Sequence, residues 1–173
     1  LENKIKSFEI EKIYTEDEGL GSNYVYAALT DNNGRLYVAT DGGGLQLLEN
    51  DKFVDLTKRF KLASNTVFSL CRDRFNNIWA TSNADGVLKF DGKTLQTINL
   101  QNGLRDAQPQ QIIASENTVY ALTSKGIDKI DCKDNSITYY DLFDGDLEPN
   151  LNAVFFNGDK IYSGTNNGLL IYR

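Results

Sequence analysis

The sequence repeats itself at a spacing of about 42 residues, and a repeat of this length points to an array of similar units. Residues 19–23 read Gly-Leu-Gly-Ser-Asn and reappear as Lys-Leu-Ala-Ser-Asn at 61–65. Later in each copy an aromatic residue recurs as Tyr37, Trp79, Tyr120 and Tyr162, and a glycine recurs as Gly44, Gly86, Gly126 and Gly168. Four copies fill the 173 residues, with approximate bounds 8–52, 53–94, 95–136 and 137–173.

Apolar residues alternate with period two inside each copy, as a half-buried strand requires. In the first copy this alternation predicts strands near 24–30, 35–40, 44–49 and 53–57. Four short antiparallel strands in about 42 residues is the period of a propeller blade, whereas helical repeats would show a 3.6-residue period. We therefore predict an all-β fold: a β-propeller domain over 1–173, built from four tandem four-stranded antiparallel blades.

Composition limits the chemistry open to the chain. It has no histidine, which removes the usual general base of hydrolytic triads and the commonest metal ligand. Its formal charge is −6 and its Lys and Arg residues are scattered, so nucleic acid is not an expected partner. We predict no catalytic residue, no metal site and no cofactor.

The two cysteines and the lone tryptophan read as structural residues. Cys71 and Cys132 stand in unlike contexts, so neither a redox pair nor a zinc site is encoded. Cys71 occupies a repeat position that is otherwise apolar, with Leu29, Ile113 and Phe155 as its equivalents. We expect Cys71 in the core and Trp79, whose equivalents are tyrosines, in the packing between blades.

A longer pattern spans residues 19–45: Gly-Leu-x-Ser-Asn-x-Val, followed by Asp-x-x-Gly-x-Leu-Tyr-Val-Ala-Thr-x-Gly-Gly-Gly-Leu. It resembles the two-component regulator propeller repeat. The second copy keeps Ser-Asn-Thr-Val at 64–67 and Asn-Ile-Trp-Ala-Thr at 77–81. The third and fourth copies depart from it, with Pro109 where Val25 and Val67 stand in the first two.

The resemblance implies a function. Blades of that family build the extracytoplasmic sensor region of membrane-bound, often hybrid, histidine kinases of Bacteroidetes-type bacteria, which commonly detect glycan fragments. It therefore implies a periplasmic or extracellular, non-enzymatic module that binds a small glycan or other small ligand. A kinase and any membrane contact would belong to other parts of the full-length protein.

Family members usually carry more blades, so the resemblance also implies that further blades or a second copy of the chain pack against this one. Residues 168–173 supply a third strand, and Phe8 to Ile13 read like the fourth strand of a preceding blade. Three arrangements are open: a closed four-bladed ring, two chains in an eight-bladed ring, or an open fragment. An open fragment would expose strand edges, which proteins normally avoid.

In a propeller, the loops that enter the innermost strand and those between the second and third strands gather on one face near the axis. These loops carry the candidate ligand-binding residues Asn23, Tyr24, Asp41, Asn65, Asn83, Asp85, Arg105 and Asn166. Polar side chains could bond sugar hydroxyls, with Tyr24 stacked on a sugar ring. Asn and Asp are also common in tight turns because their side chains bond to the local backbone. A single Asn or Asp is therefore weak evidence for a site, and the prediction depends on several of these residues lying together.

Two other functions stay open at this level. Asp41 and Asp85 could cleave glycosidic bonds if their carboxylates were held about 5–9 Å apart. A protein-docking or structural propeller would instead bury an apolar patch or an edge strand against a partner. The acidic stretch 141–148 lacks the spacing of an EF-hand calcium loop and reads as a solvated loop.

Overall fold

The computed structural model describes residues 9–140, 151–157 and 160–173 and consists almost wholly of antiparallel β-sheet. Blade one contains β1 (Val25–Thr30), β2 (Leu36–Thr40), β3 (Gly44–Glu49) and β4 (Lys52–Asp55). Blade two contains β5 (Val67–Arg72), β6 (Ile78–Ser82), β7 (Gly86–Phe90) and β8 (Leu95–Ile98). Blade three contains β9 (Gln111–Ser115), β10 (Thr118–Thr123), β11 (Gly126–Asp131) and β12 (Ile137–Tyr140). Blade four contains β13 (Leu151–Asn157), β14 (Lys160–Thr165) and β15 (Gly168–Tyr172). The predicted all-β propeller architecture is confirmed.

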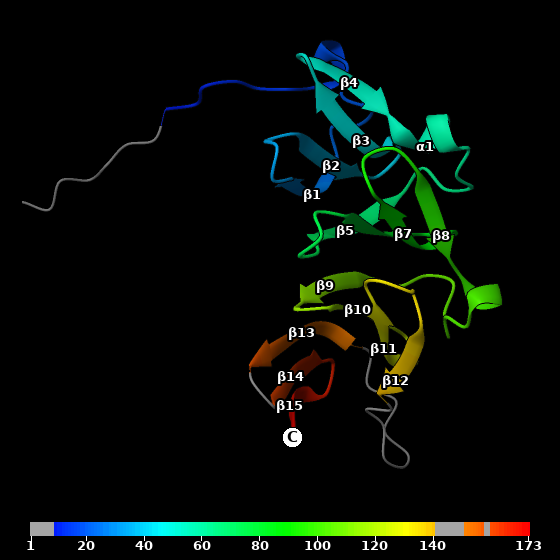
Figure 1. The fold of residues 1–173 in the computed structure, drawn as a ribbon. Helices are drawn as coiled ribbons and strands as arrows, with labels where there is room; N and C mark the ends of the chain where they lie inside the picture. Colours follow the sequence, from blue (N-terminus) through cyan, green and yellow to red (C-terminus); the bar gives the residue numbers. More distant parts are fainter. Residues whose placement is uncertain (1–8, 141–150, 158–159) are drawn as a thin grey trace, which may run out of the picture.

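The four blades follow one another along an arc, with the first strand of each blade on the inner side (Figure 1). Inner strands β1, β5 and β9 contact one another in turn, and β10 contacts β13. Among the described residues, blade four makes no comparable contact with blade one, and the two lie at opposite ends of the arc. The chain by itself thus adopts the open one of the three predicted arrangements.

Short helical turns lead into blades one, two and three. They are η1 (Glu16–Glu18), α1 (Leu56–Phe60) and η2 (Leu100–Asn102). Each begins at a capping residue, Thr15, Asp55 or Asn99, whose side chain accepts a backbone N–H of the turn. The strand predicted over 53–57 is therefore wrong at its end, because the Asp55 cap stops β4 and starts α1.

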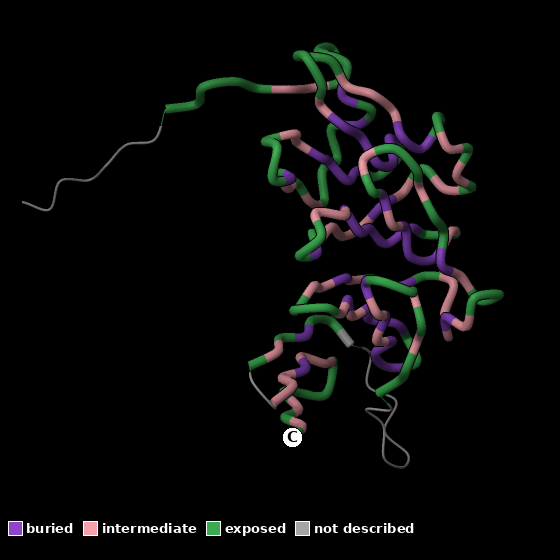
Figure 2. The backbone as a smooth tube through the Cα atoms, in the orientation of Figure 1, coloured by how far each residue is buried: buried purple, intermediate pink, exposed green. Residues whose placement is uncertain are grey.

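The core lies between neighbouring blades. Tyr37 and Trp79 are completely buried, and Trp79 packs with residues of blade three such as Val119. Cys71 packs against the same cluster, which contains Cys132. The core positions predicted for Cys71 and Trp79 are confirmed. Figure 2 shows that buried backbone is concentrated in the first three blades.

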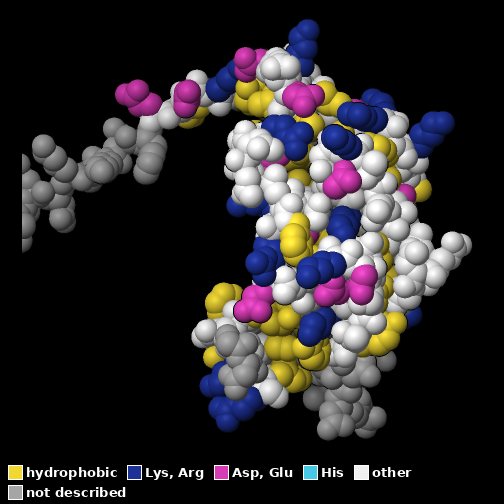
Figure 3. Space-filling model, viewed as in Figure 1, with side chains coloured by type: hydrophobic (Ala, Val, Ile, Leu, Met, Phe, Trp, Pro, Cys, Tyr) yellow, Lys and Arg dark blue, Asp and Glu magenta, His cyan; other side chains and the backbone are white. Residues whose placement is uncertain are grey.

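Blade four has an uncovered face. The residue after the hairpin glycine is buried in the first three blades, as Leu45, Val87 and Ile127, but its equivalent Leu169 is 65 % exposed. Phe155 and Ile171 are also exposed. Figure 3 shows hydrophobic side chains gathered over this part of the molecule. The residues that the structure describes leave this face of blade four exposed.

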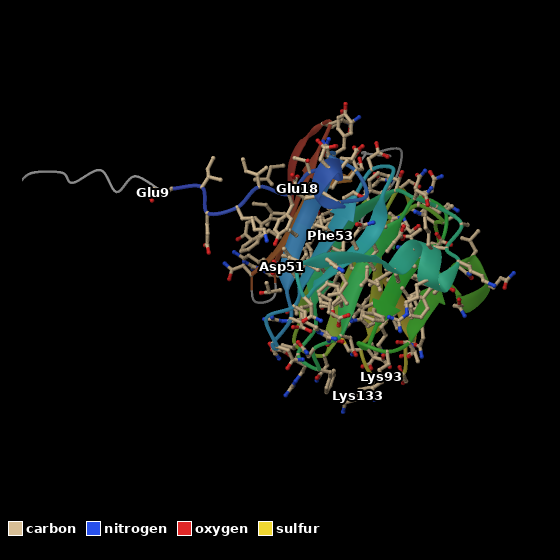
Figure 4. The ribbon with its side chains drawn as sticks, turned by 90° about the horizontal axis from the view of Figure 1, so that it is seen from above. Glu9, Glu18, Asp51, Phe53, Lys93 and Lys133 are labelled. Atoms are coloured by element: carbon tan, nitrogen blue, oxygen red, sulfur yellow. The ribbon has the colours of Figure 1, made fainter. Side chains whose placement is uncertain are left out.

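The N-terminal segment leaves the blades. Residues 9–14 form no strand, Ile10 and Ile13 are exposed, and Figure 4 shows Glu9 away from the sheets. Lys12 forms a 2.8 Å ion pair with Asp51, and the Tyr14 ring packs edge-on against Phe53. The strand predicted over Phe8 to Ile13 is thus not formed in residues 9–13, and Phe8 lies outside the described residues. In the described part of the chain, no helix is long and apolar enough to cross a membrane.

Candidate functional site

Two aromatic residues meet on the inner strands of blades one and two. Strands β1 and β5 each carry a bulge, between Val25 and Ala27 and between Val67 and Ser69. Tyr26 and Phe68 are the residues at the two bulges, and their ring centroids are 5.7 Å apart. A bulge re-aims the side chain of its extra residue, so it presents Tyr26 outward, 52 % exposed.

The carboxylate of Asp41 lies beside this aromatic pair. Its Oδ1 accepts a 2.8 Å hydrogen bond from Thr66 Oγ1, and its Oδ2 accepts one of 3.3 Å from the Tyr26 phenol. Desolvation, with the negative charge of Asp41, raises the pKa of Tyr26. Asp41 stays exposed and keeps lone pairs free for a further donor, because an ionised carboxylate has about four acceptor sites.

Four of the predicted site residues come together around Thr66. The Asp41 N–H donates to the Tyr24 carbonyl at 2.9 Å, and the Asn83 N–H donates to the Thr66 carbonyl at 3.0 Å. Asn65 directly precedes Thr66, and the Tyr24 side chain is 74 % exposed. We call the set the inner cluster; it contains Tyr24, Tyr26, Asp41, Asn65, Thr66, Phe68 and Asn83.

Two other predicted residues hold loops in place. Asn23 and Glu16 exchange two side-chain to backbone bonds, of 2.9 and 3.0 Å, across the η1 turn. The Asp85 carboxylate accepts from the N–H groups of Ala63 and Ser64, at 2.8 and 3.1 Å. Asp85 therefore fixes the loop that enters blade two, whereas Asp41 bonds to Thr66 and Tyr26.

Arg105 forms a buried ion pair. Its Nε donates to Oδ1 of Asp128 at 2.7 Å and its backbone N–H donates to Oδ2 at 2.9 Å. Asp128 is completely buried, and the guanidinium lies 4.6 Å from the centroid of the Tyr139 ring. The structure thus joins Arg105 to the third strand of its own blade. The last predicted residue, Asn166, is exposed in the β14–β15 turn of blade four.

Sequence reasoning missed Tyr26, Thr66 and Phe68. Strict alternation along β1 makes Tyr26 one more residue of a regular strand, and only the bulge shows that it is displaced. The sequence did carry one signal for this pair. Tyr26 and Phe68 are 42 residues apart, so they occupy the same position of the repeat, and both are aromatic.

The described residues contain no group of three or more Cys, Asp or Glu side chains placed to hold a metal ion. The acidic residues Asp141, Asp144, Asp146 and Glu148 lie outside the described part of the chain.

Comparison with solved structures shows the same architecture elsewhere. A domain described as the extracellular domain of the hybrid two component system BT4673 from B. thetaiotaomicron superposes with a TM-score of 0.76 at 17 % identity, over 94 % of this chain and 22 % of that one. The computationally designed Ika4 protein gives 0.62 at 14 % identity, over 88 % of this chain and 92 % of Ika4. A streptogramin B lyase gives 0.62 at 20 % identity, over 89 % and 56 % of the two chains. At these identities the similarity is one of fold, and this chain spans about a fifth of the length of the BT4673 domain.

Sequence comparison identifies the repeat. No curated protein matches the chain. The family model described as the two component regulator propeller matches residues 19–42 and 61–84. Each match runs from the loop that enters a blade to the turn after its second strand, in blades one and two. The chain is therefore a β-propeller protein that carries repeats of the two-component regulator propeller family.

Proposed function

We propose that this chain is the ligand-binding sensor module of a two-component signalling protein and that it binds a small glycan outside the cytoplasm. The repeat family supports the signalling role, and the BT4673 domain, which shares the fold, is described as extracellular. The proposed module is non-catalytic and works within a longer protein.

The observation that carries the proposal is the aromatic pair of the inner cluster beside an exposed carboxylate. Tyr26 and Phe68 form a joint apolar surface, and Asp41 provides hydrogen-bond acceptors next to it. A sugar ring has apolar C–H faces and hydroxyl donors around its rim, so it matches a surface of this kind. Tyr24 adds a second exposed aromatic ring from the same blade.

Binding without turnover is what separates this proposal from an enzyme. The fold alone does not decide, because the similar streptogramin B lyase is an enzyme by its name. Asp41 and Asp85 both bond to the loop that enters blade two, Asp41 to the Thr66 hydroxyl and Asp85 to the Ala63 N–H, so the presence or absence of product decides between sensor and enzyme.

The test is a glycan panel measured by titration calorimetry, with product analysis on the same samples. Tyr26→Ala and Phe68→Ala should each weaken binding about tenfold, as loss of an aromatic contact from a binding surface does. Phe155→Ala is the matched control, since it removes an exposed aromatic from the inner strand of blade four and should leave affinity unchanged. Product release would favour the enzyme, and no binding to any glycan would reject the glycan sensor.

A protein-docking propeller is the second candidate, and the uncovered face of blade four favours it. Phe155, Leu169 and Ile171 lie on that face and are each more than half exposed. Further blades or a second copy of the chain would cover this apolar surface. Light scattering on the wild type and on Leu169→Asp checks this by measuring the molar mass in solution. If the wild type self-associates through this face, the new charge should make the variant monomeric. A variant that still self-associates would show that another surface is used.

A further inference from the structure

A second hollow lies away from the inner cluster, between the hairpin turns of blades two and three. It is a groove of about 410 Å³, a volume within the range of small-ligand pockets. Its walls come from the β5–β6 and β7–β8 turns of blade two and the β11–β12 turn of blade three. Figure 4 shows Lys93 and Lys133, from two of these turns, at the same edge of the molecule.

The repeat explains why this junction is open while the preceding one is filled. In blade one, Arg35 extends against the β7–β8 turn of blade two, and a β-carbon added to Gly92 would lie 3.1 Å from its Nη2. The equivalent of Arg35 in blade two, 42 residues later, is Asn77, which lines the groove. Asparagine is too short to reach across as arginine does, so the space between the turns stays empty.

The positive charge at this junction is placed differently as well. Arg35 is ion-paired with Asp31 at 2.7 Å, so blade one neutralises its own cation. Of the two lysines that line the groove, the less exposed is Lys89, whose equivalent in blade one is Leu47. Lys89 is half-buried, and within the described residues no carboxylate forms an ion pair with it.

The Lys89 ammonium group donates two hydrogen bonds to described residues and has three N–H donors. It donates to the Cys132 carbonyl at 2.7 Å and to Asn135 Oδ1 at 2.9 Å, and it lies 5.0 Å from the centroid of the Trp79 ring. A lysine ammonium has three donors, so one remains for a ligand. Removing a cation partly from water is unfavourable where no carboxylate lies within ion-pair distance, so an anion in the groove would offset part of that cost.

Asp91, the acid of the groove lining, is already engaged, and the charge of Asp134 in the β11–β12 turn, outside the lining, also interacts with Lys89. Both oxygens of Asp91 bond within its own turn, to the N–H groups of Lys93 and Thr94 and to the Thr94 hydroxyl. With Lys133 also on the wall, the lining carries a net charge of +1 in a chain of −6. Phe75, 44 % exposed, supplies an apolar side to the groove.

We propose that this groove binds a small ligand through an oxyanion group that Lys89 recognises, with the body of the ligand against Phe75. A carboxylate or a sulfate group on a sugar-sized ring has this chemistry. The site shares no residue with the inner cluster, so the two proposals stand or fall separately.

The probes are glucuronate, its neutral counterpart glucose, and inorganic sulfate, titrated by calorimetry into the full chain. The fluorescence of Trp79, the single tryptophan of the sequence, gives a second readout next to Lys89. We expect saturable binding of glucuronate and none of glucose. Equal binding of sulfate would show that the oxyanion suffices, whereas binding of glucuronate alone would show that the ring contributes.

Lys89→Met should weaken glucuronate binding about tenfold or more, since hydrogen bonds to charged groups are among the stronger ones. Lys93→Met removes the same charge from the same β7–β8 turn but lies outside the lining, and should change affinity less than about twofold. The Met variant should fold, because Leu47 and Ile171 occupy this repeat position in blades one and four.

Asn77→Arg separates a built groove from general attraction of anions. It recreates the Arg35 arrangement and should abolish binding although it adds a positive charge. Tighter binding by Asn77→Arg, equal losses in Lys89→Met and Lys93→Met, or no saturable binding of glucuronate or sulfate by the wild type would each overturn the proposal.

Discussion

The indole Nε1 of Trp79 donates a 2.8 Å hydrogen bond to Oδ2 of Asp73, and both residues are buried between blades two and three. The same carboxylate accepts from the N–H groups of Phe75 and Asn77, which close the β5–β6 turn. One aspartate therefore joins a hairpin turn to the packing between two blades.

Asp73→Ala should destabilise the chain by about 3 kcal/mol or more. It leaves the buried Trp79 N–H and two turn N–H groups without their acceptor, and each unsatisfied buried group costs about 1–3 kcal/mol. Urea unfolding measures the change. Asp91→Ala is the matched control, because Asp91 bonds a turn in the same way but is exposed, and its loss should cost about 1 kcal/mol. Equal losses in the two variants would contradict the role of Asp73 between the blades.

Arg105→Ala should cost about 3–5 kcal/mol, since it leaves the buried carboxylate of Asp128 without its cation. Blades two and four carry Leu88 and Leu170 at the position of Asp128. The double variant Arg105→Ala, Asp128→Leu should therefore recover much of the loss in urea unfolding. A double variant no more stable than Arg105→Ala would show that the cost does not come from the unpaired carboxylate.

The fold could be predicted because it depends on features that recur in the sequence. Period-two alternation, turn residues and the spacing of about 42 residues specify strands and blades without long-range information. The end of β4 was missed because its cap, Asp55, competes with strand propensity through a side-chain bond to the Lys58 N–H. Such a bond is local, but it does not change the pattern of apolar residues from which the strand was predicted.

The sites were harder to predict than the fold. The roles of Arg105 and Asp85 depend on which backbone groups lie opposite them in other strands and loops, and their residue types alone do not reveal this. The groove at Lys89 arises from a residue that is shorter than its repeat equivalent, Asn77 in place of Arg35. Comparing copies for side-chain length would have pointed to that junction.

Acid should destabilise the chain partly through Asp31. Burial alone would raise the pKa of Asp31, but hydrogen bonds from Arg35 and Asn33 outweigh it and hold the pKa below its ordinary value. Because the pKa of this carboxyl is lower in the folded chain than in the unfolded chain, the unfolded chain binds the proton at a higher pH. The contribution of Asp31 to stability is therefore complete above the ordinary aspartate pKa of about 4 and is lost as the pH falls through the folded value.

Urea midpoints between pH 6 and pH 3 check this dependence. Asp31→Asn should be less stable at pH 6 and should lose less stability on acidification than the wild type. Asp17→Asn, at an exposed carboxylate with no side-chain bond in the described residues, should follow the wild-type curve. If Asp31→Asn retained the full wild-type slope, other carboxylates such as Asp106, whose pKa is also lowered, would account for it.

The two cysteines should be inert in the folded chain. Burial raises the pKa of the Cys132 thiol to about 11 and that of Cys71 further still, so at pH 8 the Cys132 thiolate is about one thousandth of the total. With a thiol reagent at pH 8 we expect slow labelling of the native chain and two reactive thiols after unfolding in urea. Lys93→Cys places a thiol on an exposed turn and should add one group that reacts at once. Native labelling of Cys71 as fast as at that added thiol would mean that the junction of blades two and three opens readily, because Cys71 packs in that junction.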